Sequence, residues 1–515
     1  MRLRRGEHGM TGRCLVGFLV LALWTLATAL DAVAQRSADT VRIAMNFPVK
    51  RLSPYYQPDI EAGMFFRLLE EPLVWYDERE GKFIPALAKS WKRVDERTLD
   101  FELRDGVKFH NGNVLTADDV VYMMKWRNDP KLRVPGATRF AFFEGIEKIG
   151  PLSVRIRTKE PTAIDMITLA YNFYIEDSRI HAKLDDKSEY GLRPIGTGPI
   201  KLEKLDQNIA VTPFNENNHH QHVRFSRLIG MVIPDAQTQS AHLLASSVDA
   251  VQPQTDDEMA NYQAQPNLKI VSKEQFALLW LGLDTRNRSG RPELQDERVR
   301  AAMFMAIDRK GIAEHFIPGE SKIIDALCFD AMSACGYNNR PPAYDPAAAK
   351  KLLSEAGYPD GFDLELVTRG LSRQAGIAIT GQLRAVGIRA SIKHLTWNGY
   401  RDYREDGKIQ AAAIDSPVGS VPDAFNVMQQ QFGTVSKDFA VDDDIQTWMA
   451  AAIGTHDIAR RKDFYAKIHD RIYEKSYLLP IATWPSTWAV NKDIEIQPPS
   501  WNNATVLVRD FAWKK

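Results

Sequence analysis

Apolar and polar residues alternate along this chain with two different periods, which predict helices and strands in turn. One helical stripe recurs at i, i+3, i+4, i+7 and i+8, and consists of Val299, Ala302, Met303, Ala306 and Ile307. This spacing predicts an amphipathic helix with its stripe buried. Strand-like runs occupy residues 98–103, 152–157, 276–283 and 362–367. The mixture continues from end to end without repeats, and it predicts an α/β architecture.

Local signals indicate where some of these helices begin and end. Asp345 followed by Pro346 is an N-cap with proline in the first turn, and Gly357 is a suitable residue to end the same helix. Thr116 and Asp119 have the spacing of a capping box before an apolar run. We therefore expect helices to start just after Thr116 and just after Asp345.

Residues 1–34 have the order of features found in a secretory signal. Arginines precede an apolar run at 15–30, and Ala32-Val33-Ala34 is a small-x-small cleavage site. The run is shorter than the roughly 20 residues needed to cross a bilayer as a helix, which favours cleavage over a retained anchor. Cys14 precedes the run and is badly placed for lipidation, while the Arg4-Arg5 pair leaves Sec and twin-arginine export open. We expect a periplasmic protein whose mature chain begins after Ala34.

The charge of the chain is balanced, with 66 basic and 66 acidic residues. Removing the signal, with four Arg, one Glu and one Asp, leaves 62 basic and 64 acidic residues. A nearly neutral chain without basic runs argues against nucleic acid or an anionic membrane as the main partner. The length predicts two or three domains with sizeable cores.

Two cysteines follow the expected cleavage site, Cys328 and Cys335. In an oxidising compartment such a close pair is expected to form a disulfide. Closing so short a loop stabilises the fold by about 2–3 kcal/mol on the chain-entropy estimate. A metal site would need further ligands, and Asp330 is a poor candidate, so a local covalent link is the simpler interpretation and no metal is expected.

Catalytic motifs are not found. The sequence has no G-x-S-x-G elbow, P-loop, H-E-x-x-H pair or complete dinucleotide fingerprint. Its one histidine cluster consists of His219, His220 and His222. Such a cluster suits Zn²⁺ or Ni²⁺, although a solvated polar loop is the commoner structure for such a run, and both interpretations stay open. We expect a binding protein without a cofactor, not an enzyme.

Five segments of the chain carry motifs in a distinctive order. The first joins P-A-L-A-K-S-W to L-R-D-G-V-K-F-H-N-G and then to L-T-A-D-D-V, and the second is P-I-G-T-G-P. The five segments are residues 85–120, 194–199, 280–309, 344–362 and 461–480. Together they resemble the bacterial extracellular solute-binding proteins of family 5. The resemblance implies the substrate-binding component of an ABC importer, a monomer that captures a small solute and delivers it to permease subunits in the inner membrane.

The resemblance also implies a fold of the periplasmic-binding-protein type, with two lobes joined by hinge strands and a third domain that enlarges one lobe. Domain I would be discontinuous, with domain II inserted in it and domain III following. The expected bounds are 35–67, 197–285 and 485–515 for domain I, 68–196 for domain II and 286–484 for domain III. The ligand would lie between the lobes, where closure excludes water and each polar group of the ligand needs a partner.

Several residues match ligand-binding positions of the family. Arg369 follows the strand after A-G-Y-P-D-G-F, where peptide-binding relatives carry an arginine that pairs with the ligand carboxylate, a group that suits the guanidinium fork. The alternative is a solvated loop arginine. Trp397 and Tyr400 resemble the family's W-x-x-Y, and Trp280 occupies an aromatic position at the junction of the lobes. These aromatic residues fit a core equally well.

One departure bears on the ligand. Peptide binders carry an aspartate for the ligand ammonium just before a P-D-x-x-N stretch, which here is 422–426. The ungapped position falls on Val418, and Asp415 takes this role only if the loop shifts by three residues. A peptide or peptide-like carboxylate remains the favoured ligand, with an oligosaccharide, an opine or a metal chelate as alternatives. An exported enzyme or chaperone-like factor on the same scaffold is the alternative from another class.

Overall fold

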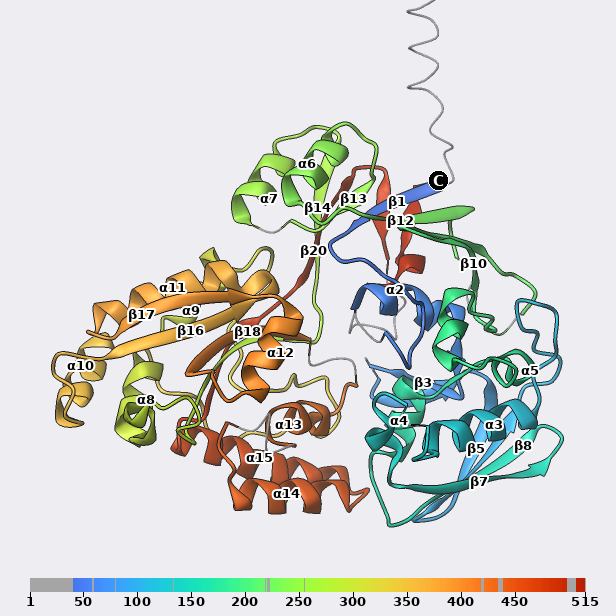
Figure 1. Ribbon diagram of the computed structural model, residues 1–515, viewed down its shortest axis with the longest axis horizontal. Coiled ribbons are helices and arrows are strands. Elements are labelled where there is room, and N and C mark those ends of the chain that lie inside the picture. Colours follow the sequence, from blue (N-terminus) through green and yellow to red (C-terminus); the bar gives the residue numbers. More distant parts are fainter. Residues whose placement is uncertain are drawn as a thin grey trace, which may run out of the picture. The chain divides into compact units, whose positions relative to one another are not determined.

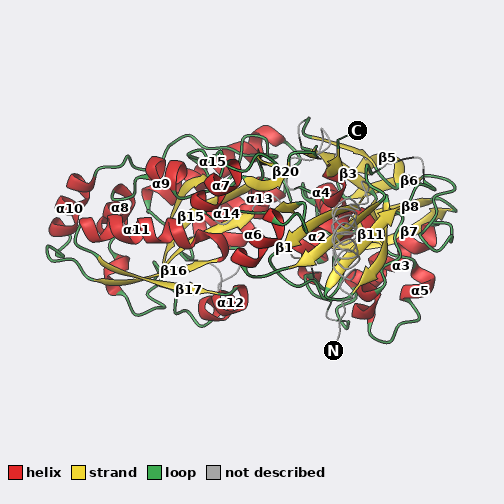
Figure 2. Cartoon of the chain, turned by 90° about the horizontal axis from the view of Figure 1, so that it is seen from above, coloured by secondary structure: helices red, strands yellow, loops and turns green. Residues whose placement is uncertain are grey.

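The computed structural model describes residues 40–57, 60–78, 80–132, 134–217, 219, 223–253, 255–417, 421–433, 439–497 and 506–514 (Figure 1). The predicted signal therefore lies outside the described residues. Helices and strands are mixed throughout, which confirms the predicted α/β class (Figure 2). No helix in the described ranges has the length and apolar character needed to cross a membrane.

A seven-stranded sheet combines segments from both ends of the chain, in the order β10-β11-β12-β1-β13-β20-β14. Helix α2 (Ile60–Leu69) packs on it through Phe65 and Leu69, which share a core with Val41 and Val211. Helices α6 (Ala236–Leu244) and α7 (Asp256–Gln263) follow the later strands of this sheet along the chain. The strands are β1 (Thr40–Met45), β10 (Ile200–Leu205), β11 (Asn208–Pro213), β12 (Arg227–Val232), β13 (Ala250–Val251), β14 (Leu268–Lys273) and β20 (Ser486–Asn491).

A second region, from residue 71 to residue 181, is built on an antiparallel four-stranded sheet in the order β5-β6-β8-β7. Helix α3 (Ala117–Asn128) packs on it, and two short strand pairs, β2 with β9 and β3 with β4, lie nearby in sequence. The remaining elements of this region are β2 (Glu71–Pro72), β3 (Val74–Asp77), β4 (Lys82–Pro85), β5 (Ala88–Asp95), β6 (Thr98–Leu103), β7 (Phe143–Gly150), β8 (Ser153–Thr158), β9 (Tyr174–Ile175), α4 (Asp165–Asn172) and α5 (Ser178–His181).

A third region is built on a five-stranded mixed sheet in the order β17-β16-β18-β15-β19. Strand β15 is buried along its whole length because helices cover both faces of this sheet. Leu279 and Leu281 face a core shared with α8 to α11, whereas Leu278 and Trp280 face a core shared with α12 to α15. The alternation of side chains along a strand explains how one apolar run serves two cores.

The elements of this third region have the following bounds. They are β15 (Ala277–Leu283), α8 (Glu297–Met305), α9 (Arg309–His315), α10 (Pro346–Glu355), β16 (Asp363–Arg369), α11 (Arg373–Ala385), β17 (Arg389–Leu395), α12 (Trp397–Glu405), β18 (Ala411–Pro417), α13 (Ala424–Phe432), α14 (Asp443–Ile453), α15 (Ile458–Glu474) and β19 (Leu478–Thr483). After β20 the chain ends with the strand pair β21 (Ile494–Ile496) and β22 (Phe511–Trp513).

The chain passes twice between the seven-stranded and five-stranded sheets. The first passage joins β14 to β15 and the second joins β19 to β20. We call residues 273–277 and 483–486 the crossover segments. Each is short, so these two sheets are connected by nearly continuous strands.

The local helix signals are confirmed. The Thr116 amide donates to Asp119 Oδ2 at 2.9 Å, as a capping box requires. The Asp345 carboxylate accepts from the Ala348 amide at 2.9 Å at the start of α10. Gly357 has φ of +94° just after that helix, a conformation that glycine adopts without steric cost.

Candidate ligand-binding site

The carboxyl ends of three parallel strands meet at one edge of the five-stranded sheet. Strand β16 pairs in parallel with both β17 and β18, and the three strands end at Arg369, Leu395 and Pro417. The antiparallel strand β15 begins at this same edge, where Ala277 lies opposite Pro417. The first crossover segment therefore leaves the sheet here. Ligands of open α/β sheets bind outside the carboxyl ends of the strands, which makes this edge the candidate site.

Arg369 is the last residue of β16 and is held in place on two sides. Its Nη2 donates to the carbonyl oxygen of Asp415 at 2.8 Å, and its Cζ lies 5.7 Å from the centre of the Tyr400 ring. The Arg369 amide donates to Ser372 Oγ at 3.2 Å, and that hydroxyl donates back to the Arg369 carbonyl at 2.7 Å. These contacts place a guanidinium between β18 and α12, at the ends of the parallel strands.

Asp415 lies beside this guanidinium near the end of β18. Burial raises the pKa of the Asp415 carboxyl to about 6, although the charge of Arg369 acts in the opposite direction. Its Oδ1 is buried and has no hydrogen-bond partner in the described part of the chain. Gly370 lies next to this carboxylate and has φ of +53°, a backbone conformation that favours glycine. At this edge of the five-stranded sheet, the Arg369 guanidinium and the titratable Asp415 carboxyl are therefore neighbours.

Tyr400 is 2% exposed and lies between two guanidinium groups. The Arg404 Cζ is 5.4 Å from its ring centre, a distance similar to that of Arg369. Burial raises the pKa of the Tyr400 hydroxyl, so it stays protonated. Sequence reasoning missed Arg404 and Ser372. The spacing of i and i+4 on a predicted helix could have placed Arg404 beside Tyr400, whereas nothing in the sequence pointed to Ser372.

Comparison with known proteins decides the family. The sequence model described as "Bacterial extracellular solute-binding proteins, family 5 Middle" matches residues 82–439, well over half of the chain. The chain belongs to this family. The predicted membership is confirmed, and with it the expectation of a solute-binding protein.

Curated relatives and solved structures agree with this assignment. Heme-binding protein A of Haemophilus influenzae is 25% identical over 358 residues, which are 64% of this chain and 64% of that protein. The nickel-binding periplasmic protein of Escherichia coli K12 is 25% identical over 509 residues, 89% of this chain and 91% of that protein. The dipeptide-binding protein of Pseudoalteromonas sp. SM9913, solved with Met-Leu, has a TM-score of 0.80 at 20% identity and covers 92% of this chain and 100% of its own. That likeness confirms the predicted fold.

Of the two tryptophans expected at the ligand site, the structure describes the side chain of Trp280 but not that of Trp397. Trp280 is 3% exposed, and its ring makes an edge contact with Phe439 at 6.0 Å between centres. The ring also lies over Gly282, where a Cβ would come within 2.7 Å of it. Trp280 therefore packs within a core. Trp397 is the first residue of α12, but its side chain lies outside the described part, as does Val418.

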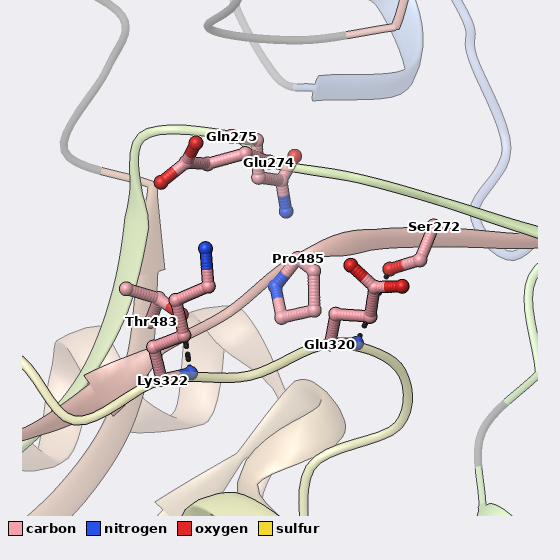
Figure 3. A pocket seen from close by; sticks show the side chains of 7 residues that line it. All are labelled: Ser272, Glu274, Gln275, Glu320, Lys322, Thr483 and Pro485. Carbon is pink, nitrogen blue, oxygen red and sulfur yellow. Dashed lines mark hydrogen bonds between the residues drawn. The ribbon is translucent and has the colours of Figure 1, made fainter.

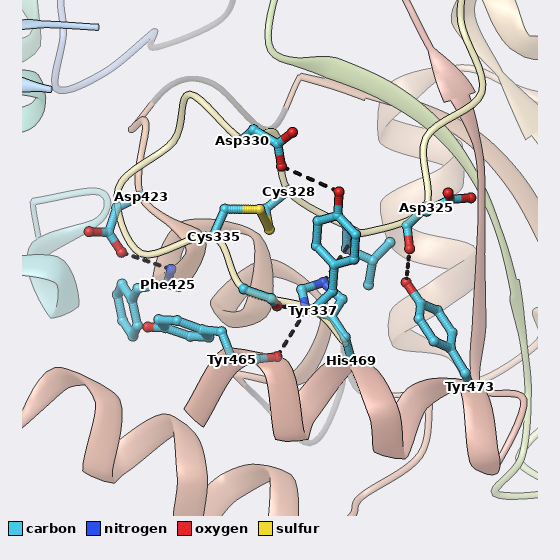
Figure 4. Close-up of a disulfide and its surroundings, with 12 residues drawn as sticks. Asp325, Cys328, Asp330, Cys335, Tyr337, Asp423, Phe425, Tyr465, His469 and Tyr473 are labelled. Atoms are coloured by element: carbon cyan, nitrogen blue, oxygen red, sulfur yellow. Dashed lines mark hydrogen bonds between the residues drawn. A yellow bond between two sulfur atoms is a disulfide. The ribbon is translucent and has the colours of Figure 1, made fainter. Parts of the chain in front are cut away.

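The predicted disulfide is present between Cys328 and Cys335 (Figure 4). The histidine cluster is described only at His219, whose Nε2 lies 3.1 Å from both carboxylate oxygens of Glu71. His220 and His222 lie outside the described residues. Among the residues that are described, no three His, Cys, Asp or Glu side chains are grouped so as to hold a metal.

A small cavity lies at the crossover segments, and Arg369 is not among the residues that line it (Figure 3). Its volume of about 130 Å³ has room for a few waters, each of about 30 Å³. It is smaller than the roughly 300–1,000 Å³ of pockets that bind small molecules, so by itself it does not enclose a ligand of that size. Its lining residues are Ser272, Glu274, Gln275, Glu320, Lys322, Thr483 and Pro485.

Proposed function

We propose that this protein is the substrate-binding component of an ABC importer, and that it captures a small solute bearing a carboxylate and delivers it to permease subunits in the inner membrane. The observation that carries this proposal is Arg369, a guanidinium held at the carboxyl ends of three parallel strands in a family 5 solute-binding protein. The guanidinium fork matches the geometry of a carboxylate. No cofactor, metal or catalytic step is part of the proposal.

A peptide or peptide-like amide is the ligand that we favour. The dipeptide-binding protein with Met-Leu supports this class by its fold, and a relative named dipeptide-binding protein from Escherichia coli K12 is 26% identical over 365 residues. Asp415 is a carboxylate beside Arg369, and we propose that it serves the ligand's polar end, together with Tyr400 and Trp397. Oligosaccharides, opines and metal chelates are the alternatives that the ligand identification below decides.

Ligand capture would use a hinge at the crossover segments. The domain bounds that we propose are 35–67, 197–285 and 485–515 for domain I, 68–196 for domain II and 286–484 for domain III. These bounds assign β15 to domain I, but β15 is hydrogen-bonded to β18 and β19, so a hinge at residues 273–277 would move it with domain III and would end this part of domain I before residue 277. Closing about such a hinge needs φ and ψ changes at only a few residues.

Export precedes this function. We propose that residues 1–34 are removed and that the monomeric mature protein works in the periplasm. The names of relatives such as the nickel-binding periplasmic protein support this location. Intact-mass analysis of protein from the periplasm should show the loss of residues 1–34, and full-length protein in the membrane fraction would refute the proposal.

The decisive experiment identifies the ligand and then removes Arg369. Protein purified from its native periplasm without dialysis is denatured, and the released molecule is identified by mass spectrometry and titrated calorimetrically into ligand-free protein. If Arg369 pairs with a buried carboxylate, Arg369→Ala should weaken binding by about 2–5 kcal/mol, since the carboxylate is left unpaired. Arg369→Lys keeps the charge but loses the fork, so an intermediate loss is expected.

Arg373→Ala is the matched control, because Arg373 is an exposed arginine four residues away at the start of α11. It should change affinity by less than about 1 kcal/mol, as expected for an exposed charge. Equal losses of affinity in Arg369→Ala and Arg373→Ala would show that Arg369 does not bind the ligand. A neutral sugar as the released molecule would refute the carboxylate, and conversion of the ligand to a product would refute a pure receptor.

A further inference from the structure

The disulfide closes a loop that lies against the segment following the candidate site. We call residues 328–335 the disulfide loop and residues 421–424 the supported segment. The Ser333 amide donates to the Pro422 carbonyl at 2.9 Å, and the Ala424 amide donates to the Ser333 carbonyl at 2.9 Å. These two bonds join Ser333 to both sides of Asp423, in the manner of a parallel strand pair.

A buried ion pair also anchors the same segment to α15. Arg461 of α15 donates to Asp423 through Nη2 at 2.7 Å and Nη1 at 3.0 Å, and its Nε donates to the Ala452 carbonyl at 3.0 Å. The Asp423 carboxylate also caps α13 by accepting from the Phe425 amide at 2.9 Å. The supported segment is therefore bonded to α15 through Arg461 and to the disulfide loop through Ser333, and Figure 4 shows Asp423 near that loop.

His469 holds both ends of the disulfide loop. The Leu327 amide, just before Cys328, donates to His469 Nε2 at 3.0 Å. Because Nε2 accepts this bond, the ring hydrogen is on Nδ1, which lies 2.7 Å from the carbonyl oxygen of Gly336 just after Cys335. Burial lowers the pKa of His469 to about 4, so the ring is neutral under ordinary conditions. The loop is thus closed covalently and held at its base.

The supported segment is close in sequence to Asp415, the residue whose carbonyl binds Arg369. Strand β18 carries Asp415 and ends at Pro417, four Cα steps before Val421. Since consecutive Cα atoms are about 3.8 Å apart, Val421 lies at most about 15 Å from the end of β18. The position of the supported segment therefore limits where the end of β18 can lie, and it is the Asp415 carbonyl near that end that binds Arg369.

The disulfide loop also meets the region of the four-stranded sheet. Tyr76 of β3 lies close to Asp423, because burial and then the Asp423 charge raise the pKa of the Tyr76 hydroxyl to about 12. Val421 is buried in the core that this region forms with Tyr76 and Leu73. A displacement of the disulfide loop would therefore change the packing of Val421 as well as the two backbone bonds of Ser333.

We propose that the Cys328–Cys335 disulfide is a positioning device for ligand binding, because it holds Ser333 where it fixes residues 421–424 and, through them, the end of β18. This inference rests on the proposed function only for its effect on affinity. Opening the bond with a dithiol breaks the S–S bond, leaves two thiols and closes the reductant into its own cyclic disulfide, so two electrons are transferred. The freed loop then has to be ordered at each binding event.

The first test is hydrogen exchange on the ligand-free mature protein, which needs no ligand. Wild type is compared with Cys328→Ser/Cys335→Ser, with wild type reduced by dithiothreitol, and with Ser333→Pro, which removes the amide bound to Pro422 but keeps the disulfide. We expect faster exchange at residues 411–417 and 421–433 in all three, while β6 (98–103) is unchanged. Asp330→Ala is the control, because Asp330 is exposed in the same loop and contacts Tyr337 at 3.4 Å.

The second test is affinity for the molecule released from wild type by denaturation and added back. Ordering a loop of eight residues corresponds to a factor of at most about sixty on the chain-entropy model, so we expect the Kd to rise between about fivefold and sixtyfold on opening the disulfide. Asp330→Ala should leave the Kd unchanged.

Exchange that speeds up only within residues 328–335, or an unchanged Kd in a folded reduced protein, would overturn the inference. If wild type binds no released molecule, the proposed function fails while the exchange result still decides the inference. Should the double serine variant not fold, the reduced wild type and Ser333→Pro carry the same comparison.

Discussion

The buried pair of Arg461 and Asp423 allows a sharp prediction about stability. Both side chains are 2–3% exposed, and Arg461 makes three hydrogen bonds, two of them to the carboxylate. Arg461→Met keeps most of the apolar stem of the side chain but removes the charge and all three donors. Asp423 would then be a buried carboxylate whose remaining bond is from the Phe425 amide at the cap of α13.

The expected cost follows from this geometry. Breaking a buried ion pair by removing one partner destabilises by about 3–5 kcal/mol, because the remaining charge is not compensated. Replacing both partners is milder, since no buried charge is left. Arg461→Met/Asp423→Asn should cost only about 1–2 kcal/mol, and the asparagine can still accept the helix-capping bond. The double variant should therefore be more stable than the single one.

Arg227 and Glu203 offer a matched control at the surface. Arg227 donates to the two Glu203 oxygens at 2.7 and 2.9 Å, so the pair is also bidentate, but both side chains are 40% exposed. Arg227→Met should cost at most about 1 kcal/mol because water screens and replaces the contact.

Urea unfolding of the mature chain measures all of these values. The transitions are followed by circular dichroism and by fluorescence, since coincidence of the two probes justifies a single free energy of unfolding in a chain of this size. The reasoning would be refuted if Arg461→Met cost no more than Arg227→Met. It would equally fail if the double variant were less stable than Arg461→Met.

Three further predictions concern other parts of the molecule. Gly361 and Gly387 both have positive φ, but a Cβ on Gly361 would lie 1.8 Å from the Gly387 carbonyl oxygen whereas one on Gly387 meets nothing closer than 3.9 Å. In urea unfolding, Gly387→Ala should lower the free energy of unfolding by about 1–2 kcal/mol, and Gly361→Ala should lower it clearly more. Equal losses in the two variants would contradict the prediction. The Asp415 pKa is raised from 3.8 to about 6, so the free energy of unfolding should fall by up to about 3 kcal/mol as pH rises from 4 to above 6. Asp415→Asn should abolish this fall in thermal melts recorded across that pH range. Burial and the Glu176 charge raise the Glu70 pKa well above 4.5, so wild type should lose stability relative to Glu70→Gln as pH rises above 4.5, and a pH-independent difference in Tm would disprove it.

The elements that sequence predicted well are those whose causes are local. The capping box at Thr116 and the N-cap at Asp345 each depend on residues within four positions, and both helices begin where these signals place them. The strand expected at 276–283 corresponds to β15, because an apolar run of this length is typical of a buried strand and short for a helix. The disulfide was predictable for the same reason, since its partners are seven residues apart.

The supports of the site were not predictable, because their causes lie far apart in the chain. Asp423 and Arg461 are 38 residues apart and on different helices, and either could be a solvated surface residue from sequence alone. Ser333 acts through backbone groups, which every residue except proline possesses, so no side-chain pattern marks it. Trp280 shows the converse limit, since an aromatic residue in an apolar strand fits a core and a binding site equally well.

The position of Asp415 beside Arg369 follows from the register of two strands and not from the alignment of a motif. Strands β16 and β18 pair in parallel with Leu366 opposite Ala411 and Thr368 opposite Ala413. Continuing this register places Asp415 across from Gly370, directly beside Arg369. A slip of one residue would turn Asp415 to the opposite face of the sheet. An ungapped alignment puts the ammonium-binding position at residue 418, yet the carboxylate beside Arg369 comes from three residues earlier. The chemistry at this edge is therefore decided by the pairing of two strands more than forty residues apart, and a ligand prediction for a family 5 protein should follow the register before it follows the motif.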